Sequence, residues 1–460
     1  MHIAVEKLRF LPARQVTDDP ALLTLRSLVL EPLCLWRHGR AAPGLFARWQ
    51  HHDEGRRWIF QIRDGAIFHD GTPCDADTIL HFIAGIRDAI DTFGMASSYA
   101  RYLAGCRITA LSRRDVQVEA PAPFADILDL FAEFFISRET AEGLPLLGTG
   151  PYRVVDYAPE RQVRLARVYA TAGPAQVTLL AVPLAEDRLR ALRDGAVDVA
   201  MNLERCEHRL AFDADLDWLR TVNTLSVTAF LNAASGPFAR PEARLAVNHA
   251  VDGQAIVEEI FFGLGVPATT IVSPAHLGAS AAALAPIPYD PEAARRLFDT
   301  ADIRAPVLIR TPTTTPERAE RISQALAEAL SAVGVPARIE VQPDRPAYAR
   351  EASRREIGDM AIFDSTPQST YRILNDKISS AVRALWWQGH DDPALEALIQ
   401  RANRTVGDTA REAAYGACLT RLHANPAWLY LFHPIAVAGM RDGCADLMLN
   451  ARGVIGFHPR

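Results

Sequence analysis

The sequence lacks the features of a membrane span, of a zinc site and of a nucleic-acid-binding surface. No stretch approaches the roughly 20 consecutive apolar residues that a membrane-spanning helix needs. The six cysteines are scattered without a Cys-x-x-Cys pair, so we expect most of them to be small buried apolar residues. A single disulfide between two of them is the alternative. The net charge of −6 is spread along the chain, which argues against a nucleic-acid groove.

An export signal is also not visible in this sequence. Residues Met1–Lys7 contain no cationic segment followed by an apolar one. Two locations therefore remain open, the cytoplasm or the periplasm with the signal removed.

The composition is that of a folded protein with more than one domain. The chain has 460 residues, of which 49% are hydrophobic and 23% charged. In the first half, Trp58, Phe60 and Ile62 alternate as on a strand, and turns follow. Asp75 or Asp77 then predicts the start of a helix whose apolar stripe runs to Ile90. Further strands are expected at 116–118, 152–155 and 163–165.

The second half has an α/β pattern. A strand is expected at 306–310, a helix from Thr315-Pro316 to Gly334, and a strand at 335–341. This is one βαβ unit and predicts a parallel strand pair. Asp-Pro pairs at 290–291 and 392–393 predict further helix starts, and residues 428–432 a late strand.

Catalytic signals are weak. The Gly148-x-Gly150 pair lacks the third glycine and the Gly-Lys ending of nucleotide loops, so we interpret it as a tight turn. His51-His52-Asp53 and His69-Asp70 lie in turn-like contexts and are poor metal-site candidates. The serines show no nucleophile elbow. We therefore predict no catalytic residue, no metal and no cofactor; an enzyme using the His/Asp clusters is the least favoured hypothesis.

One segment combines aromatic, hydroxyl and charged side chains, as a small-molecule site does. It spans residues 363–374 and continues at 386–388. Arg372 is a candidate for a ligand carboxylate, and Asp364 for an ammonium or guanidinium group. The aromatic residues are candidates for stacking on a ring or covering a cation. The candidates here are Asp364, Ser365, Gln368, Tyr371, Arg372, Trp386 and Trp387. The alternative is that both tryptophans are core and that Asp364 pairs with Arg372.

Several motifs occur in a fixed order along the chain. They are EPL at 31–33, PGLFARW at 43–49, FQIRDGAIFHDGTP at 60–73, GTGPY at 148–152, LRDGAVD at 192–198, and N…PF…R-x-A-x-N-x-x-x-D from 232 to 252. As an ordered set they resemble family 5 of the bacterial extracellular solute-binding proteins, the peptide, nickel and opine binding group. The resemblance runs from about residue 20 to the C-terminus.

The resemblance implies an α/β, two-lobed periplasmic-binding-protein-like fold of class II, cluster C type, with a hinge and a ligand cleft between the lobes. Lobe I would hold residues 1–233 with 433–460 returning to it, and lobe II residues 234–432. It also implies that Glu31, Trp36 and Asn232 lie near the ligand. Peptide-binding relatives carry Gly-Trp where this chain has Asp364-Ser365, so ordinary peptide binding is disfavoured.

The resulting prediction is the substrate-binding component of an ABC-type importer and not an enzyme. It would hold a small polar or zwitterionic solute, whether peptide-like, opine-like or an amino-acid derivative, and deliver it to permease subunits in the inner membrane. We expect a periplasmic monomer without nucleic-acid partners. The alternative is a cytoplasmic ligand-sensing domain of a regulator, although no helix-turn-helix precedes the fold here.

Overall fold

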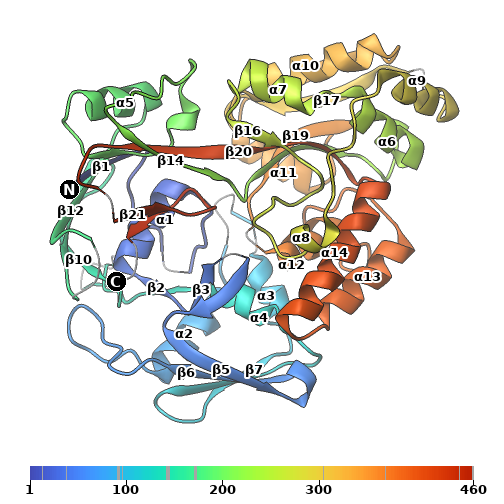
Figure 1. Ribbon diagram of the computed structural model, residues 1–460. Helices are drawn as coiled ribbons and strands as arrows, with labels where there is room; N and C mark the ends of the chain where they lie inside the picture. Colours follow the sequence, from blue (N-terminus) through green and yellow to red (C-terminus); the bar gives the residue numbers. More distant parts are fainter. Residues whose placement is uncertain are drawn as a thin grey trace. The chain divides into compact units, whose positions relative to one another are not determined.

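The chain divides into two compact units (Figure 1). The computed structural model describes residues 1–12, 14–37, 39–90, 94–95, 97–140, 146–169, 173–303, 305–367, 369–444 and 446–457. Unit 1 comprises Met1–Thr221 and Ala436–Arg460, and unit 2 comprises Val222–Ile435. Each unit has its own apolar core, so each is described by itself.

Unit 1 is built on a mixed sheet. Its strand order is β10-β11-β12-β1-β13-β20, with β14 also paired to β20. β1 is parallel to both β12 and β13, whereas β10 to β12 are antiparallel. The strands are β1 (His2–Val5), β10 (Tyr152–Ala158), β11 (Gln162–Arg167), β12 (Gln176–Ala181), β13 (Val199–Ala200), β14 (Asp217–Val222) and β20 (Trp428–Met440).

A second sheet of unit 1 has the order β5-β6-β8-β7. Trp58, Phe60 and Ile62 all lie on its buried face, which confirms the alternation predicted for this strand. The strands are β5 (Phe46–His52), β6 (Arg57–Ile62), β7 (Arg107–Ala110) and β8 (Asp115–Glu119). Short pairs are β2 (Glu31–Pro32) with β9 (Phe135–Ile136), β3 (Cys34–Arg37) with β4 (Arg40–Pro43), and β21 (Leu447–Leu449) with β22 (Ile455–Phe457).

The helices of unit 1 include one whose predicted end was wrong. α2 begins after Asp75, whose carboxylate accepts from the backbone N–H of Thr78, as the sequence predicts. It stops at Ile86, and Ile90 is 60% exposed because the chain has already left the helix there. The helices are α1 (Pro20–Val29), α2 (Ala76–Ile86), α3 (Ser98–Tyr102), α4 (Ile127–Phe131), α5 (Ala185–Arg193) and the 3-10 turns η1 (Asp53–Gly55) and η2 (Leu203–Arg205).

The two glycines of the GTGPY motif are required by a close backbone approach. A Cβ on Gly148 would lie 2.0 Å from the carbonyl oxygen of Val29, and one on Gly150 would lie 2.6 Å from its carbonyl carbon. The N–H of Gly150 donates to that same oxygen at 3.1 Å. The motif therefore closes the chain against the end of α1, which confirms its structural interpretation.

Unit 2 has the strand order β20-β15-β19-β17-β18, with β16 on β20. β17 is parallel to β18 and joined to it through α10, which is the predicted βαβ unit. Ile362 of β19 belongs to the core beneath α10, so the next residue, Phe363, faces the opposite side of the sheet. The strands are β15 (Ser226–Leu231), β16 (Gly265–Pro267), β17 (Val307–Pro312), β18 (Ala337–Gln342) and β19 (Met360–Ser365).

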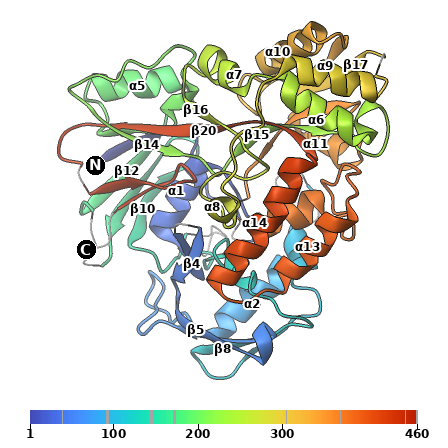
Figure 2. The ribbon, with the colours of Figure 1, turned by 45° about the vertical axis from the view of Figure 1, so that its right-hand side comes forward.

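Helices flank this sheet, and α13 and α14 pack side by side (Figure 2). Asp290 and Asp392 cap α9 and α13 as predicted. The start predicted at Thr315-Pro316 was wrong, because Arg318 has a left-handed φ of 57° and α10 begins only after it. The helices are α6 (Pro241–Ala250), α7 (Gly253–Ile260), α8 (Ala279–Ala282), α9 (Pro291–Thr300), α10 (Ala319–Ala332), α11 (Arg345–Ser353), α12 (Thr370–Ile373), α13 (Pro393–Asn403), α14 (Asp408–Ala424), the 3-10 turn η3 (Pro237–Ala239) and the π-helical turn η4 (Leu374–Ile378).

The cysteines are buried side chains of the folded units. All six cysteines are buried and free, and burial raises the pKa of their thiols, that of Cys74 to about 12.

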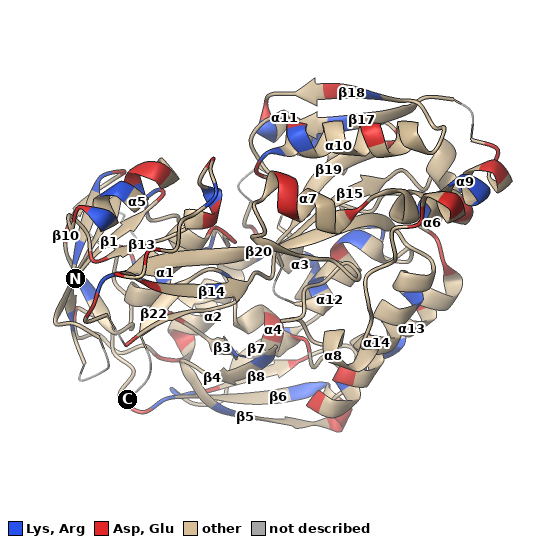
Figure 3. Cartoon of the chain, turned by 45° about the horizontal axis from the view of Figure 1, so that its top comes forward, with Lys and Arg blue, Asp and Glu red and all other residues tan. Residues whose placement is uncertain are grey.

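Lys and Arg alternate with Asp and Glu over helices such as α5, α9 and α10 (Figure 3). Within the described part of the chain, no helix has the length and apolar character needed to cross a membrane.

Candidate functional site

A guanidinium group and a carboxylate form an ion pair at the end of β19 in unit 2. Arg345, the first residue of α11, donates from Nη2 to Oδ1 of Asp364 at 3.2 Å. Both side chains keep contact with solvent, at 15% and 14% exposure. The ion pair of Arg372 that the structure shows is with Asp376, at 3.9 Å, and not with Asp364. Asp364 therefore has a cationic neighbour that the sequence did not point to.

Aromatic rings form a wall beside Arg345 of this pair. The ring of Phe363 stacks on Phe230 with centroids 4.7 Å apart and contacts Trp386 at 5.3 Å. The guanidinium carbon of Arg345 lies 4.6 Å from the Phe363 centroid. The ammonium of Lys377 lies 6.0 Å from the same centroid. Two cations thus share the electron-rich faces of one aromatic cluster.

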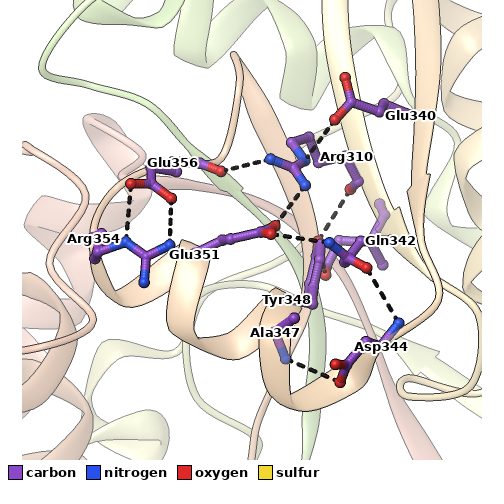
Figure 4. A network of polar contacts seen from close by, with 10 residues as sticks. Arg310, Glu340, Gln342, Asp344, Ala347, Tyr348, Glu351, Arg354 and Glu356 are labelled. Atoms are coloured by element: carbon purple, nitrogen blue, oxygen red, sulfur yellow. Dashed lines mark hydrogen bonds and ion pairs between the residues drawn. The ribbon is translucent and has the colours of Figure 1, made fainter.

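A polar network fixes α11, and with it Arg345, against the sheet (Figure 4). Arg310 of β17 donates from Nη2 to Glu351 at 2.6 Å, and Gln342 donates to the other oxygen of that carboxylate at 2.9 Å. The buried hydroxyl of Tyr348 lies 2.7 Å from the carbonyl oxygen of Ile362. Because α11 is tied to three strands, Arg345 is held in place before any ligand arrives.

Buried hydroxyls and histidines lie beside Ser365. Ser226 is paired with Ser365 across β15 and β19, and its Oγ lies 3.1 Å from Nδ1 of His433. His276 contacts the Ser273 hydroxyl at 3.0 Å and the carbonyl oxygen of Pro367, in the candidate segment, at 2.8 Å. Desolvation by burial lowers the pKa of each histidine to about 4. Both histidines are therefore uncharged at neutral pH.

Ser365 itself is completely buried. Its Oγ has no hydrogen-bond partner within the described residues. Tyr371 is also buried, in α12, directly before the π-helical turn η4. Irregular helical turns of this kind are frequent at functional sites.

The other predicted residues of unit 2 have structural contacts. Trp387 is buried, and its indole N–H donates to the carbonyl oxygen of His390 at 2.8 Å. Asn232 donates from Nδ2 to the carbonyl oxygen of Gly358 at 3.0 Å and so holds the start of β19. Gln368 lies outside the described residues.

The two candidates of unit 1 lie on short strands. Glu31 in β2 accepts from Nη2 of Arg63 at 2.8 Å, and both side chains are about a quarter exposed, at 24% and 27%. Trp36 in β3 is half-buried. A partly accessible ion pair and a partly accessible indole are both suited to ligand contact.

Four residues near the segment were missed by sequence reasoning. They are Arg345, Lys377, His276 and His433. Asp344-Arg345-Pro346 carries only the pattern of a helix start, and the histidines stand alone in sequence. His433 reaches the segment through the pairing of β15 with β20, and Arg345 and His276 reach it through single side-chain contacts over long sequence separations, which no local pattern reveals.

The alternative metal clusters do not form within the described residues, where no group of three or more His, Cys, Asp or Glu is arranged to hold an ion. His69 lies instead against the GTGPY loop, with Nε2 3.0 Å from the carbonyl oxygen of Gly150. His51 contacts the ring of Trp58.

Comparison with known proteins decides the family. The sequence model of the bacterial extracellular solute-binding proteins, family 5, middle region, matches residues 40–372. The chain belongs to this family.

Curated relatives of this solute-binding protein agree with that assignment. The nickel-binding periplasmic protein of Escherichia coli (strain K12) is 26% identical, over 89% of this chain and 84% of that protein. The probable di/tripeptide-binding protein 5 of Pseudomonas aeruginosa is 25% identical, over 90% and 86%. Among solved structures, that of NikA from Brucella suis in complex with Fe(III)-EDTA has a TM-score of 0.81 at 19% identity, and covers 100% of this chain and 99% of that one.

The family assignment establishes the fold class and the role. The fold is the two-lobed α/β fold of periplasmic binding proteins. The protein is a substrate-binding component of an ABC importer, and its family consists of solute-binding proteins rather than enzymes. Members work with ABC transporter permeases and are periplasmic or extracellular. The comparisons favour this role over a regulator domain.

Proposed function

We propose that this solute-binding protein acts in the periplasm as a monomer and captures a small polar or zwitterionic solute for its permease. The solute class comprises peptide-like compounds, opine-like compounds and amino-acid derivatives. Arg345 binds the carboxylate of the solute, Asp364 binds its ammonium or guanidinium group, and Trp386 covers its apolar part.

The observation that carries this proposal is the Arg345–Asp364 pair on an aromatic wall. The two groups lie 3.2 Å apart and are partly exposed, so each can exchange its partner for a charged group of the solute. A zwitterion offers one charge to each. The ring of Phe363 supports the guanidinium from behind, which keeps it in place during the exchange.

The relatives are named for nickel and for di- or tripeptides, which are small, charged or polar cargoes. The family resemblance implies that Asp364 and Ser365 stand in place of the Gly-Trp of peptide-binding members, and Ser365 is wholly buried. This supports an amino-acid derivative or an opine over an ordinary peptide.

The test is a calorimetric titration of the protein with amino acids, opine-like conjugates, dipeptides and metal chelates. We expect at least one zwitterionic solute to bind. Asp364→Asn keeps the shape of the side chain and removes its charge. It should lower the affinity for that solute by about tenfold or more, because a charge-assisted hydrogen bond contributes roughly 1.5–3 kcal/mol. Arg345→Gln should act in the same direction.

The matched control is Arg354→Gln. Arg354 also lies at α11 but pairs with Glu356 on the surface, with both side chains about half exposed. The Arg354→Gln variant should bind the solute with the affinity of the parent protein. Equal affinity of the parent protein and Asp364→Asn for every solute that binds, with folding confirmed by circular dichroism, would contradict the proposed site.

A further inference from the structure

A separate pocket lies wholly within unit 2, away from the end of β19. It has a volume of about 270 Å³. Its walls come from the junction of α6 and α7, from the end of β16, from residues 286–289 and from β20. No residue of the proposed solute site lines it.

The wall formed by residues 286–289 is held in place at both ends. His249 of α6 contacts the carbonyl oxygen of Pro288 through Nδ1 at 2.8 Å, and its own carbonyl oxygen accepts from the N–H of Asp290 at 2.9 Å. On the other side, Nε2 of His423 lies 2.9 Å from the carbonyl oxygen of Ala285. The pocket is therefore preformed, which lowers the cost of binding.

Most polar side chains of the pocket are already occupied. Asn248 donates twice, to the carbonyl oxygens of Arg244 and Trp428, and accepts from the N–H of Tyr430. The Tyr430 hydroxyl donates to the carbonyl oxygen of Leu422 at 3.0 Å. These groups bond to the backbone of α6, α14 and β20 and leave little capacity for a ligand.

Asp252 is different. It is the one charged side chain among the described residues that line the pocket, and no described cation forms an ion pair with it. Its Oδ1 caps α7 by accepting from the N–H of Ala255 at 3.0 Å. Because the carboxylate itself occupies the helix start, that end of α7 is not free to attract an anion.

The remaining wall also favours a cation. Pro267, Pro286 and Pro288 have carbonyl oxygens but no N–H, so these three positions offer acceptors only. The ring of Tyr289 is 53% exposed at the pocket. An exposed tyrosine face attracts a guanidinium or an alkylammonium group.

We propose that this pocket is a second binding site, for the guanidinium or primary ammonium group of a small solute. Asp252 neutralises the cation, the carbonyl groups of Pro267 and Pro286 accept its remaining hydrogens, and Tyr289 covers it. The volume of about 270 Å³ fits one arginine-sized compound.

The test is calorimetric titration of the full chain with agmatine, which carries a guanidinium and an amine but no carboxylate. We expect agmatine to bind the parent protein, and Asp252→Asn to weaken this binding by about tenfold. Asparagine caps helices as well as aspartate does, so α7 should remain intact. Tyr289→Ala should also weaken the binding of agmatine, whereas Tyr289→Phe should leave this binding unchanged.

Asp290→Asn is the matched control. Asp290 caps α9, directly follows Tyr289 and does not line the pocket, so agmatine should bind this variant as it binds the parent. Three results would overturn the proposal: no agmatine binding tighter than about 10 mM, equal binding by the parent and Asp252→Asn, or glutamate binding that Asp252→Asn strengthens. An agmatine response lost only in Asp364→Asn would assign the compound to the β19 site and would also overturn it.

Discussion

At the scale of single residues, unit 2 carries three histidines, His276, His390 and His433, whose burial lowers the pKa to about 4 and keeps them neutral at pH 7. His276 and His433 are 3% and 1% exposed, and apart from the backbone N–H of Ser273, which donates to Nδ1 of His276, the partners that the structure gives them are hydroxyls and carbonyl oxygens. Neither type of partner compensates a buried positive charge as a carboxylate would. Protonation of either ring in the folded chain is therefore disfavoured until the pH falls to about 4.

This predicts that stability falls on acidification. The pKa of each histidine is about 4 in the folded chain against 6.5 ordinarily, so between these values the unfolded chain binds more protons. The free energy of unfolding should be fully retained above pH 6.5 and should fall as the pH drops towards 4, by on the order of 3 kcal/mol for one histidine. Urea titrations at a series of pH values measure this.

Substitution separates the contribution of these two residues. In His433→Gln the free energy of unfolding should depend less steeply on pH between 6.5 and 4, although the variant starts from a lower value at pH 7. The control is His51→Gln, since His51 is exposed and should leave the slope unchanged. An unchanged slope in His433→Gln would show that this ring is already protonated in the folded protein.

At the scale of elements, buried arginines join helices to the strands beside them. Arg188 of α5 is completely buried. It donates to the carbonyl oxygens of Val182, Pro183, Met201 and Asn202 at 2.7 to 3.0 Å. These oxygens belong to the segments that follow β12 and β13. One side chain thus satisfies four backbone acceptors and fixes α5 on unit 1.

Arg188→Met is expected to destabilise unit 1 by about 3–5 kcal/mol, because it leaves buried carbonyl groups without donors. The measurement is the urea midpoint of unfolding followed by circular dichroism. Arg190→Gln on the same helix removes only a surface pair with Asp187 and should change stability by less than about 1 kcal/mol. Equal effects of the two substitutions would refute the role given to Arg188.

Elements were predictable where the signal is local. The alternation of Trp58, Phe60 and Ile62 and the capping carboxylates of Asp75, Asp290 and Asp392 act within a few residues, so the sequence alone reveals them. The start of α10 was not predictable, because Thr-Pro is a frequent helix start and nothing nearby signals the left-handed conformation of Arg318.

The candidate site shows the same division. The mixed composition of the segment around Asp364 singles it out in the sequence. Its cationic partner, Arg345, does not follow from the sequence because it arrives from α11, 19 residues earlier in the chain. Likewise, His433 meets Ser226 only through the pairing of β15 with β20, 207 positions apart.

At the scale of the whole molecule, two units with separate cores share one chain that passes from unit 1 to unit 2 and back. The second passage runs within β20, which pairs with β15 by its first residues and with β13 by its last. The net charge of −6 with interspersed signs suits a protein that stays dispersed in an aqueous compartment (Figure 3). These properties match the role of a carrier that takes up a solute and releases it unchanged.

The most direct test is a crystal structure of the protein with the solute that binds it most tightly in the calorimetric screen. The account predicts an intact solute whose carboxylate lies within hydrogen-bonding distance of Arg345 and whose cationic group lies within reach of Asp364, with Trp386 against its apolar part. A solute that makes no contact with the end of β19, or one found cleaved or otherwise converted, would contradict it.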